Sequence, residues 1–198
     1  MIEFKITAPD TAGVIAEIRR AKDFLTKGPA AAAMATAIVT RVKENFGVLS
    51  QKPNRLSAPP TGFWLQCADS THADKTVTGG TSAVVKVSQR GAALQYYGGT
   101  VKPKNTSEIT GKPIRFLTIP VTAAAHGKTV AKLAALGVKL RLLGGALVDE
   151  RGQGYFALVR QAVIKPNPSV LPSEAALKEA AVKGINDAWA ATQAQLSQ

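Results

Sequence analysis

The chain has 198 residues, of which 45% are hydrophobic and 19% are charged, a composition typical of a folded protein with one buried core. The 25 lysines and arginines, against 13 acidic residues, give a net charge of +12, which favours nucleic acid, anionic surfaces or acidic proteins as partners. The basic residues are scattered without a run of five, which argues against a dedicated reader of DNA sequence, and a single cysteine excludes an internal disulfide.

The N-terminal part is expected to be a strand followed by a helix. Between residues 2 and 6, apolar side chains alternate with polar ones, which is the period of a half-buried strand. Between residues 11 and 27, apolar residues recur at helical spacing and form one stripe, with the charged residues mostly elsewhere. The stripe consists of Val14, Ile15, Ile18, Ala21 and Leu25. Gly28 and Pro29 then end the helix.

A second helix and a long loop follow. The alanine-rich segment from Ala30 to Phe46 has high helix propensity, and we expect the helix to stop at Gly47. The segment from Lys52 to Trp64 contains several prolines and no periodicity, so it is predicted to be an ordered loop anchored by Phe63 and Trp64. Loops of this length are commonly functional.

A β-hairpin is predicted next. Thr76 to Val87 has Gly79 and Gly80 at its centre between flanks rich in β-branched residues, which is the signal for a two-residue hairpin turn. We expect this hairpin to protrude from the fold.

The middle of the chain combines a short helical turn with an edge strand. After the turn at residues 91–97, Gly98 and Gly99 allow the backbone to adopt positive φ. Pro103 cannot donate to a ladder and therefore confines its strand to a sheet edge. An open edge invites a neighbouring chain, and a further strand is expected at residues 116–121.

The last third is expected to complete an antiparallel sheet. A helix at residues 123–136 closes at Gly137, and two strands follow at residues 138–143 and 155–165. A proline-rich connector leads to a final helix capped by Ser173. No apolar stretch approaches the length of about 20 residues that spans a bilayer, so we expect no membrane segment.

These elements predict one α+β domain over residues 1–198. It would have a mostly antiparallel sheet with the protruding hairpin, packed by the N-terminal helices. Residues 166–198 would form the proline-rich connector and the long C-terminal helix.

No catalytic or metal site is predicted. Ser70, His72 and Asp74 suggest a triad, but they lie within five residues, whereas triad members normally come from separate elements, so we interpret them as polar loop residues. Cys67 and His72 leave only His126 as a further imidazole or thiol, too few for a structural zinc site. The Gly-Gly pairs lack the continuation of a phosphate-binding loop. We therefore expect no enzyme activity, metal or cofactor.

Aromatic and basic residues leave alternatives open. For the pairs Phe63–Trp64 and Tyr96–Tyr97, packing or loop anchoring is favoured over base stacking, because no RNA-binding signature surrounds them. Four basic residues at alternate positions of predicted strands would make one sheet face basic, either lining a DNA passage or simply facing solvent. They are Lys86, Lys139, Arg141 and Arg160.

The order of these pieces resembles the phage virion morphogenesis family, the neck and tail-completion proteins of tailed phages and prophages. The resemblance covers nearly the whole chain, and its middle segment is moderately specific. Its segments are Asn54-Arg55-Leu56 to Thr61-Gly62-Phe63-Trp64, then Tyr96-Tyr97-Gly98-Gly99-Thr100-Val101-Lys102-Pro103, Leu117-Thr118-Ile119-Pro120, and Tyr155-Phe156-Ala157-Leu158-Val159-Arg160 leading to Leu171-Pro172.

The resemblance implies a structural protein that forms a ring, usually of six subunits, around the DNA channel at the head–tail interface or tail end. Its partners would be head-connector or neck proteins and the tail tube or tail terminator, after synthesis in the host cytoplasm. The candidate assembly residues are Phe63, Trp64, Gly79, Gly80, Tyr96, Tyr97, Gly98, Gly99, Lys102 and Pro103. The main alternative is a basic protein that binds nucleic acid without sequence specificity, and a weaker one is a hydrolase that uses Ser70 and His72.

Overall fold

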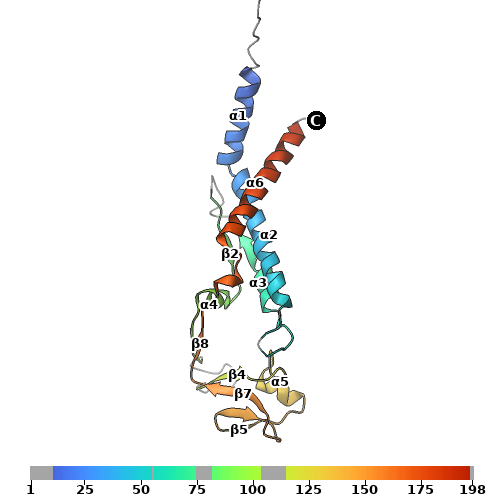
Figure 1. Cartoon of the computed structure of the whole chain (residues 1–198), viewed down its shortest axis with the longest axis vertical. Helices are drawn as coiled ribbons and strands as arrows, with labels where there is room; N and C mark the ends of the chain where they lie inside the picture. The colour runs from blue at the N-terminus through green and yellow to red at the C-terminus, as the bar shows by residue number, and fades with distance from the viewer. Residues whose placement is uncertain (1–10, 55, 75–81, 104–114, 197–198) are drawn as a thin grey trace, which may run out of the picture. The chain divides into compact units, whose positions relative to one another are not determined.

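The computed structural model describes residues 11–54, 56–74, 82–103 and 115–196 of the chain (Figure 1). These residues form helices and antiparallel sheets and end in a long helix, so the predicted α+β class is confirmed. They cluster into two compact units, and neither unit is one continuous segment of the chain. The single domain over residues 1–198 stays a prediction, and the strand expected at residues 2–6 lies outside the described residues.

The first unit combines three helical segments with a short hairpin. It takes in residues 1–43, 71–87 and 172–198. Its elements are α1 (Thr11–Thr26), the first part of α2 (Pro29–Gln51), β1 (Thr71–Ala73), β2 (Val85–Val87) and α6 (Glu174–Leu196). α1 ends where predicted, because Gly28 has φ +107° and Pro29 then occupies the first position of α2, where its missing N–H costs nothing.

Close packing joins the helices of this unit. Phe24 is buried against Trp189, with ring centroids 5.2 Å apart, and this contact ties α1 to α6. α6 also approaches α2 closely at Gly184, where an added Cβ would lie 2.5 Å from the Cβ of Ala37. Small residues at this crossing therefore let the two backbones come together.

Most of the predicted apolar stripe of α1 is exposed. Val14, Ile15, Ile18 and Leu25 are 48%, 49%, 63% and 48% exposed, and the buried aromatic residue of the helix is Phe24. The predicted helix is therefore confirmed, and most of its apolar stripe is exposed. A period shows that a helix has an apolar face and does not show what covers it.

The hairpin prediction is confirmed in part. β2 lies inside the predicted segment and pairs in antiparallel register with β1, with His72 opposite Lys86. The second strand of the pair was not expected, since β1 precedes the predicted segment. Gly79 and Gly80 lie outside the described residues.

The second unit, residues 44–70 and 88–171, holds two sheets and the shorter helices. Its helices are α3 (Phe63–Asp69), α4 (Ala92–Tyr97), α5 (Val130–Ala135) and the 3-10 turn η1 (Pro168–Val170). A two-stranded sheet pairs β3 (Gly99–Val101) with β8 (Ala162–Ile164). A four-stranded sheet has the order β4 (Leu117–Pro120), β7 (Gly154–Val159), β6 (Ala146–Val148) and β5 (Arg141–Leu143), all antiparallel.

α2 continues past the predicted stop at Gly47 and ends at Gln51. Gly47 does not adopt positive φ, and a glycine inside a helix costs only about 1 kcal/mol. Tertiary contacts offset that cost: Phe46 is 1% exposed and stacks on Trp64, and the Asn45 side chain donates to the carbonyl oxygen of Val170 at 2.9 Å. The expected end at Gly47 was therefore wrong.

The C-terminal strands are shorter and more numerous than predicted. β5 and β6 form a tight hairpin around Gly144 (φ +55°) and Gly145 (φ +82°), the backbone that a primed hairpin turn needs. The segment expected as one strand at residues 155–165 is two strands, β7 and β8, which belong to different sheets. The break lies at Arg160 and Gln161, which are both exposed.

The helix predicted at residues 123–136 starts later, at Val130. Thr129 caps it by accepting a hydrogen bond from the Lys132 amide, and the segment before it forms turns. Its end agrees with the prediction, because Gly137 has φ +81° and the Val138 amide donates to the carbonyl oxygen of Leu133. A small core forms here from Ala125, Leu133 and Phe156, with Val138, Leu140, Leu147 and Tyr155 packed around it.

Candidate functional site

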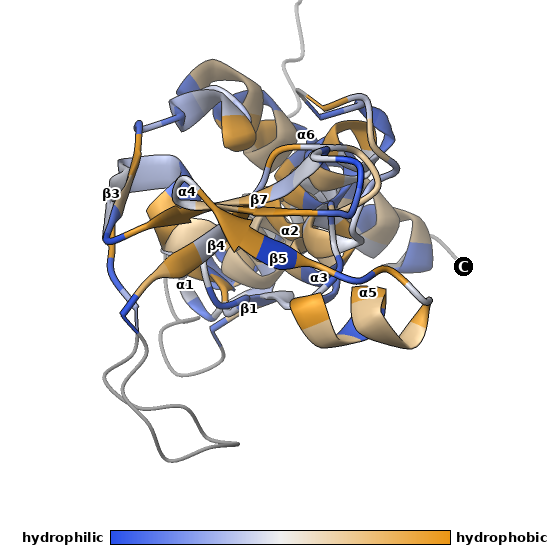
Figure 2. Cartoon of the chain, turned by 90° about the horizontal axis from the view of Figure 1, so that it is seen from below, coloured by the Kyte–Doolittle hydropathy of each residue, from blue (hydrophilic) through white to orange (hydrophobic). Residues whose placement is uncertain are grey.

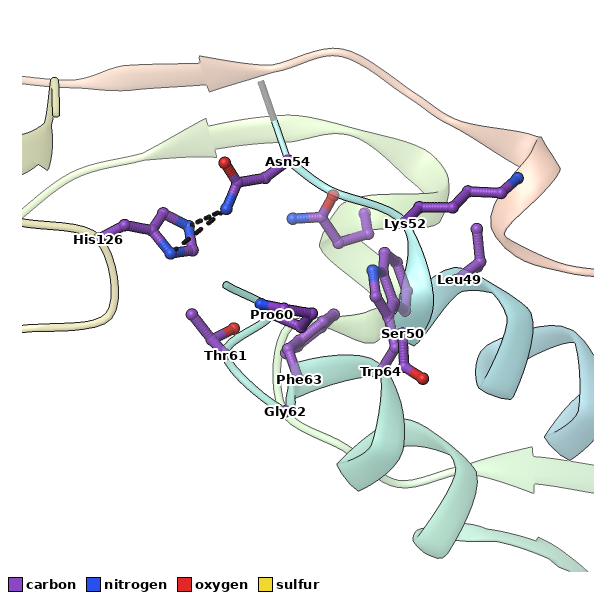
Figure 3. A pocket seen from close by; sticks show the side chains of 11 residues that line it. Leu49, Ser50, Lys52, Asn54, Pro60, Thr61, Gly62, Phe63, Trp64 and His126 are labelled. Atoms are coloured by element: carbon purple, nitrogen blue, oxygen red, sulfur yellow. Dashed lines mark hydrogen bonds between the residues drawn. The ribbon is translucent and has the colours of Figure 1, made fainter. Parts of the chain in front are cut away.

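The loop between α2 and α3 encloses a cavity of about 320 Å³ in the second unit (Figure 3). The walls come from the end of α2 and the loop, the start of α3, one residue of α4 and the turn before α5. The lining residues are Leu49, Ser50, Lys52, Asn54, Pro60, Thr61, Gly62, Phe63, Trp64, Gln95 and His126. Two of the predicted assembly residues, Phe63 and Trp64, thus line a cavity.

Asn54 holds the loop in shape. Its side-chain oxygen accepts hydrogen bonds from the amides of Leu56 (2.8 Å) and Ala58 (3.2 Å). Its amide nitrogen donates to the carbonyl oxygen of Ala58 and faces the imidazole of His126, at 3.1 Å from Nε2. Asparagine is suited to this role because its short amide can satisfy a turn of its own backbone. The contact with His126 also ties the loop to the turn before α5 (Figure 3).

An aromatic cluster forms one wall of the cavity. Trp64 stacks on buried Phe46, with centroids 5.8 Å apart and planes 13° from parallel. Phe63 meets Trp64 edge to face at 4.9 Å and packs near Gly91, the N-cap of α4. The predicted anchoring is confirmed, but Phe63 and Trp64 begin helix α3, which was not predicted, instead of ending the loop.

The lining of the cavity carries a positive charge and no negative one. Lys52 is its one charged lining residue, and no aspartate or glutamate lines it. Within the described part of the chain, no carboxylate forms an ion pair with Lys52, which is exposed. The cavity therefore offers a positive charge beside an apolar wall.

The glycines after α4 serve internal packing. Gly98 has φ +72° and ψ −175°, and an added Cβ would lie 2.7 Å from both the Ile164 oxygen and the Pro166 nitrogen. The Asn167 amide donates to the carbonyl oxygens of Gln95 and Tyr96, which fixes the connector beside α4. This part of the candidate assembly segment holds the fold of the second unit together.

The rest of that segment is partly open to solvent. Tyr96 and Tyr97 meet edge to face at 4.7 Å, and Tyr97 is 75% exposed. In the described residues β3 pairs with β8 alone, and the edge position of this strand stays a prediction. Lys102 is exposed and Pro103 half-buried just beyond β3.

The four basic residues do not share one sheet face. Lys86 lies in β2 of the first unit and pairs with Asp74, at 2.5 Å between Nζ and Oδ2. Arg141 lies in β5, Lys139 precedes it, and Arg160 follows β7. The expectation of a single basic face was wrong, because alternation along separate segments does not place them in one sheet. Whether any of the four contacts DNA stays a prediction.

The polar residues around β1 have structural partners. The Ser70 hydroxyl donates to the carbonyl oxygen of Cys67 at 3.0 Å and accepts from the Gln89 amide at 2.9 Å. Burial raises the pKa of the Cys67 thiol to about 11, which keeps it protonated near neutral pH. Among the residues that the structure describes, no group of three or more histidine, cysteine or acidic side chains could hold a metal ion.

A second exposed apolar surface was missed by the sequence analysis. β5 is an edge strand of the four-stranded sheet, and Figure 2 shows its ribbon partly in the colour of hydrophobic residues. Its apolar residues Leu142 and Leu143 are 67% and 54% exposed. Leu136, at the end of α5, is 66% exposed. The signal was present, since two leucines precede the Gly-Gly turn, but periodicity does not distinguish an edge strand from a buried one.

Comparisons of the chain with family models, curated proteins and solved structures find no match. In the part of the chain that the structure describes, each helix is too short or too polar to cross a bilayer.

Proposed function

We propose that the chain is a structural subunit of a tailed phage or prophage particle, a neck or tail-completion protein that forms a ring around the DNA channel. The resemblance of its loop, tyrosine–glycine and C-terminal segments to the phage virion morphogenesis family supports this function. The observation that carries the proposal is the exposed apolar face of α1, which no residue that the structure describes covers.

That face has a clear energetic consequence. Val14, Ile15, Ile18 and Leu25 are about half exposed or more, and they lie along one side of a 16-residue helix. Covering apolar surface gains about 25 cal/mol for each Å² removed from water. A neighbouring subunit would supply that cover, and repeated contacts of this kind close into rings when the rotation between subunits allows it.

The proposed partners are further copies of the chain, expected to number six, together with head-connector or neck proteins and the tail tube or tail terminator. The virion would be its final location. Arg141 and Arg160 are exposed, and no ion pair joins either to a carboxylate of the described residues, so both remain available to DNA phosphates.

A substitution on α1 tests the proposal. Ile18→Glu places a charge in the uncovered face, and Thr40→Glu adds the same charge at an exposed position of α2. We expect wild type and Thr40→Glu to form rings, seen by negative-stain electron microscopy, alone or with connector and tail components. Ile18→Glu should stay monomeric by light scattering. Equal behaviour of the two variants, or a wild type that never assembles, would count against the proposal.

The net charge of +12 favours a second candidate, a nucleic-acid-binding protein without sequence specificity. This function predicts that the isolated monomer binds duplex DNA and that the affinity falls steeply as salt rises. Fluorescence anisotropy with a labelled duplex at two salt concentrations distinguishes the candidates. Strong binding by Ile18→Glu without assembly would favour the second.

A further inference from the structure

We infer that the cavity beside Trp64 docks an extended segment of an acidic partner protein, which inserts one bulky apolar side chain next to a carboxylate. The inference concerns a different surface from the α1 face and does not depend on ring formation. It assigns a ligand to a site that the sequence analysis identified only as an anchored loop.

The size and walls of the cavity suit one large side chain. Its volume of about 320 Å³ lies at the lower end of the range for small-ligand pockets, about 300–1,000 Å³. Phe63 and Trp64 provide an aromatic wall, and Leu49 and Pro60 add apolar surface. An aromatic anchor entering such a pocket is the usual centre of a protein interface.

The positive charge of the lining favours an acidic residue next to the anchoring side chain of the bound segment. Lys52 is the charged residue of the lining, and no acidic side chain accompanies it. A carboxylate next to the anchor would therefore meet a cation that forms no ion pair within the described residues. The net charge of +12 draws the same acidic partner from a distance, so both the local and the overall charge favour it.

Contacts within the second unit hold the walls of the cavity in place. Asn54 fixes the loop through its bonds to Leu56, Ala58 and His126. Trp64 is held against Phe46, which is 1% exposed. A pocket with fixed walls costs little ordering entropy on binding, which permits a short segment to bind detectably.

The geometry favours a peptide over a nucleic-acid base. Base stacking needs a free aromatic platform and several cations to follow the phosphates. One side of the Trp64 ring is already stacked on Phe46, and Phe63 contacts it edge to face. Lys52 alone cannot follow a phosphate backbone, so the cavity fits a single side chain better than a strand.

Nuclear magnetic resonance titration of the full chain tests the inference. The probes are three blocked tripeptides, Ac-Asp-Phe-Glu-NH₂, Ac-Lys-Phe-Lys-NH₂ and Ac-Asp-Ala-Glu-NH₂, and an oligothymidylate. The indole N–H signal of Trp64 reports binding and is assigned by comparison with Trp189→Phe. We expect only the first peptide to shift this signal at millimolar concentration.

Two variants and a control locate the binding site. Lys52→Gln should weaken binding of the acidic aromatic peptide about two- to fivefold, as expected for an exposed ion pair. Thr61→Phe adds bulk in the lining and should weaken binding by about tenfold or more. Thr118→Phe, at an exposed site on β4, should leave affinity unchanged.

Three results would overturn the inference. Equal shifts with the basic peptide would remove the role of Lys52, and a larger shift with oligothymidylate would assign the cavity to nucleic acid. A Trp64 signal that no peptide moves, in a wild-type protein with a dispersed spectrum, would show that the cavity takes no such segment.

Discussion

Gly98→Ala should be among the most destabilising single-methyl changes in the chain. Gly98 has φ +72° and ψ −175°, a region of the backbone map that is almost restricted to glycine and costs other residues about 1–3 kcal/mol. The new Cβ would also lie 2.7 Å from the Ile164 oxygen and the Pro166 nitrogen. Relieving such overpacking costs a further ~1–3 kcal/mol.

We therefore expect the free energy of unfolding to fall by about 3 kcal/mol or more in Gly98→Ala. Urea unfolding followed by circular dichroism measures this change. Gly137→Ala is the matched control, because Gly137 has φ +81° but nothing lies within 4 Å of its added Cβ. It should lose only ~1–2 kcal/mol. Equal losses in the two variants would show that Ile164 and Pro166 do not pack on Gly98 as described.

Three further predictions concern α2, the loop and α3. Gly47→Ala should raise the free energy of unfolding by about 0.5–1 kcal/mol in the same urea assay, because the helical backbone accepts a methyl group and nothing lies within 4 Å of it. A lower free energy of unfolding would contradict a helix at this position. Asn54→Ala should speed hydrogen exchange at the Leu56 and Ala58 amides, and Asn54→Asp should largely preserve their protection because it keeps the acceptor oxygen. Burial raises the pKa of the Cys67 thiol to about 11, so the unfolded chain loses the thiol proton at a lower pH than the folded chain does. The protonated thiol should make its whole contribution to the free energy of unfolding below pH about 9 and lose roughly 2 kcal/mol of it towards pH about 11. The difference in the free energy of unfolding between wild type and Cys67→Ala measures this loss. The same pH dependence in both proteins would contradict the prediction.

Local signals in the sequence predicted where the helices and strands lie better than they predicted what those elements pack against. Helical spacing located α1, and the glycine after α5 marked its end correctly. The same spacing could not show that Ile18 would face outward, because burial depends on which other elements are present. Likewise, the continuous β pattern from residues 155 to 165 hid a change of sheet at Arg160, which is decided by pairing partners far away in the sequence.

For the candidate site too, the sequence predicted the local parts and missed the residues that come from distant segments. The proline-rich composition identified the loop, and the aromatic pair at its end was correctly expected to anchor it. Gln95 and His126 could not be assigned to the cavity, because they reach it from distant segments of the chain. Asn54 carried a local signal, since asparagine favours turns, but its contact with His126 is a tertiary one.

The contact between Phe24 and Trp189 has a consequence for biosynthesis. It joins α1 to α6, the last helix of the described residues, so it cannot form until α6 has emerged from the ribosome. Gly184 and Ala37 are similarly separated. The nascent chain must therefore carry α1 and α2 without this cover while the segments between α2 and α6 are made, and the packing of the first unit cannot be completed before α6 is available.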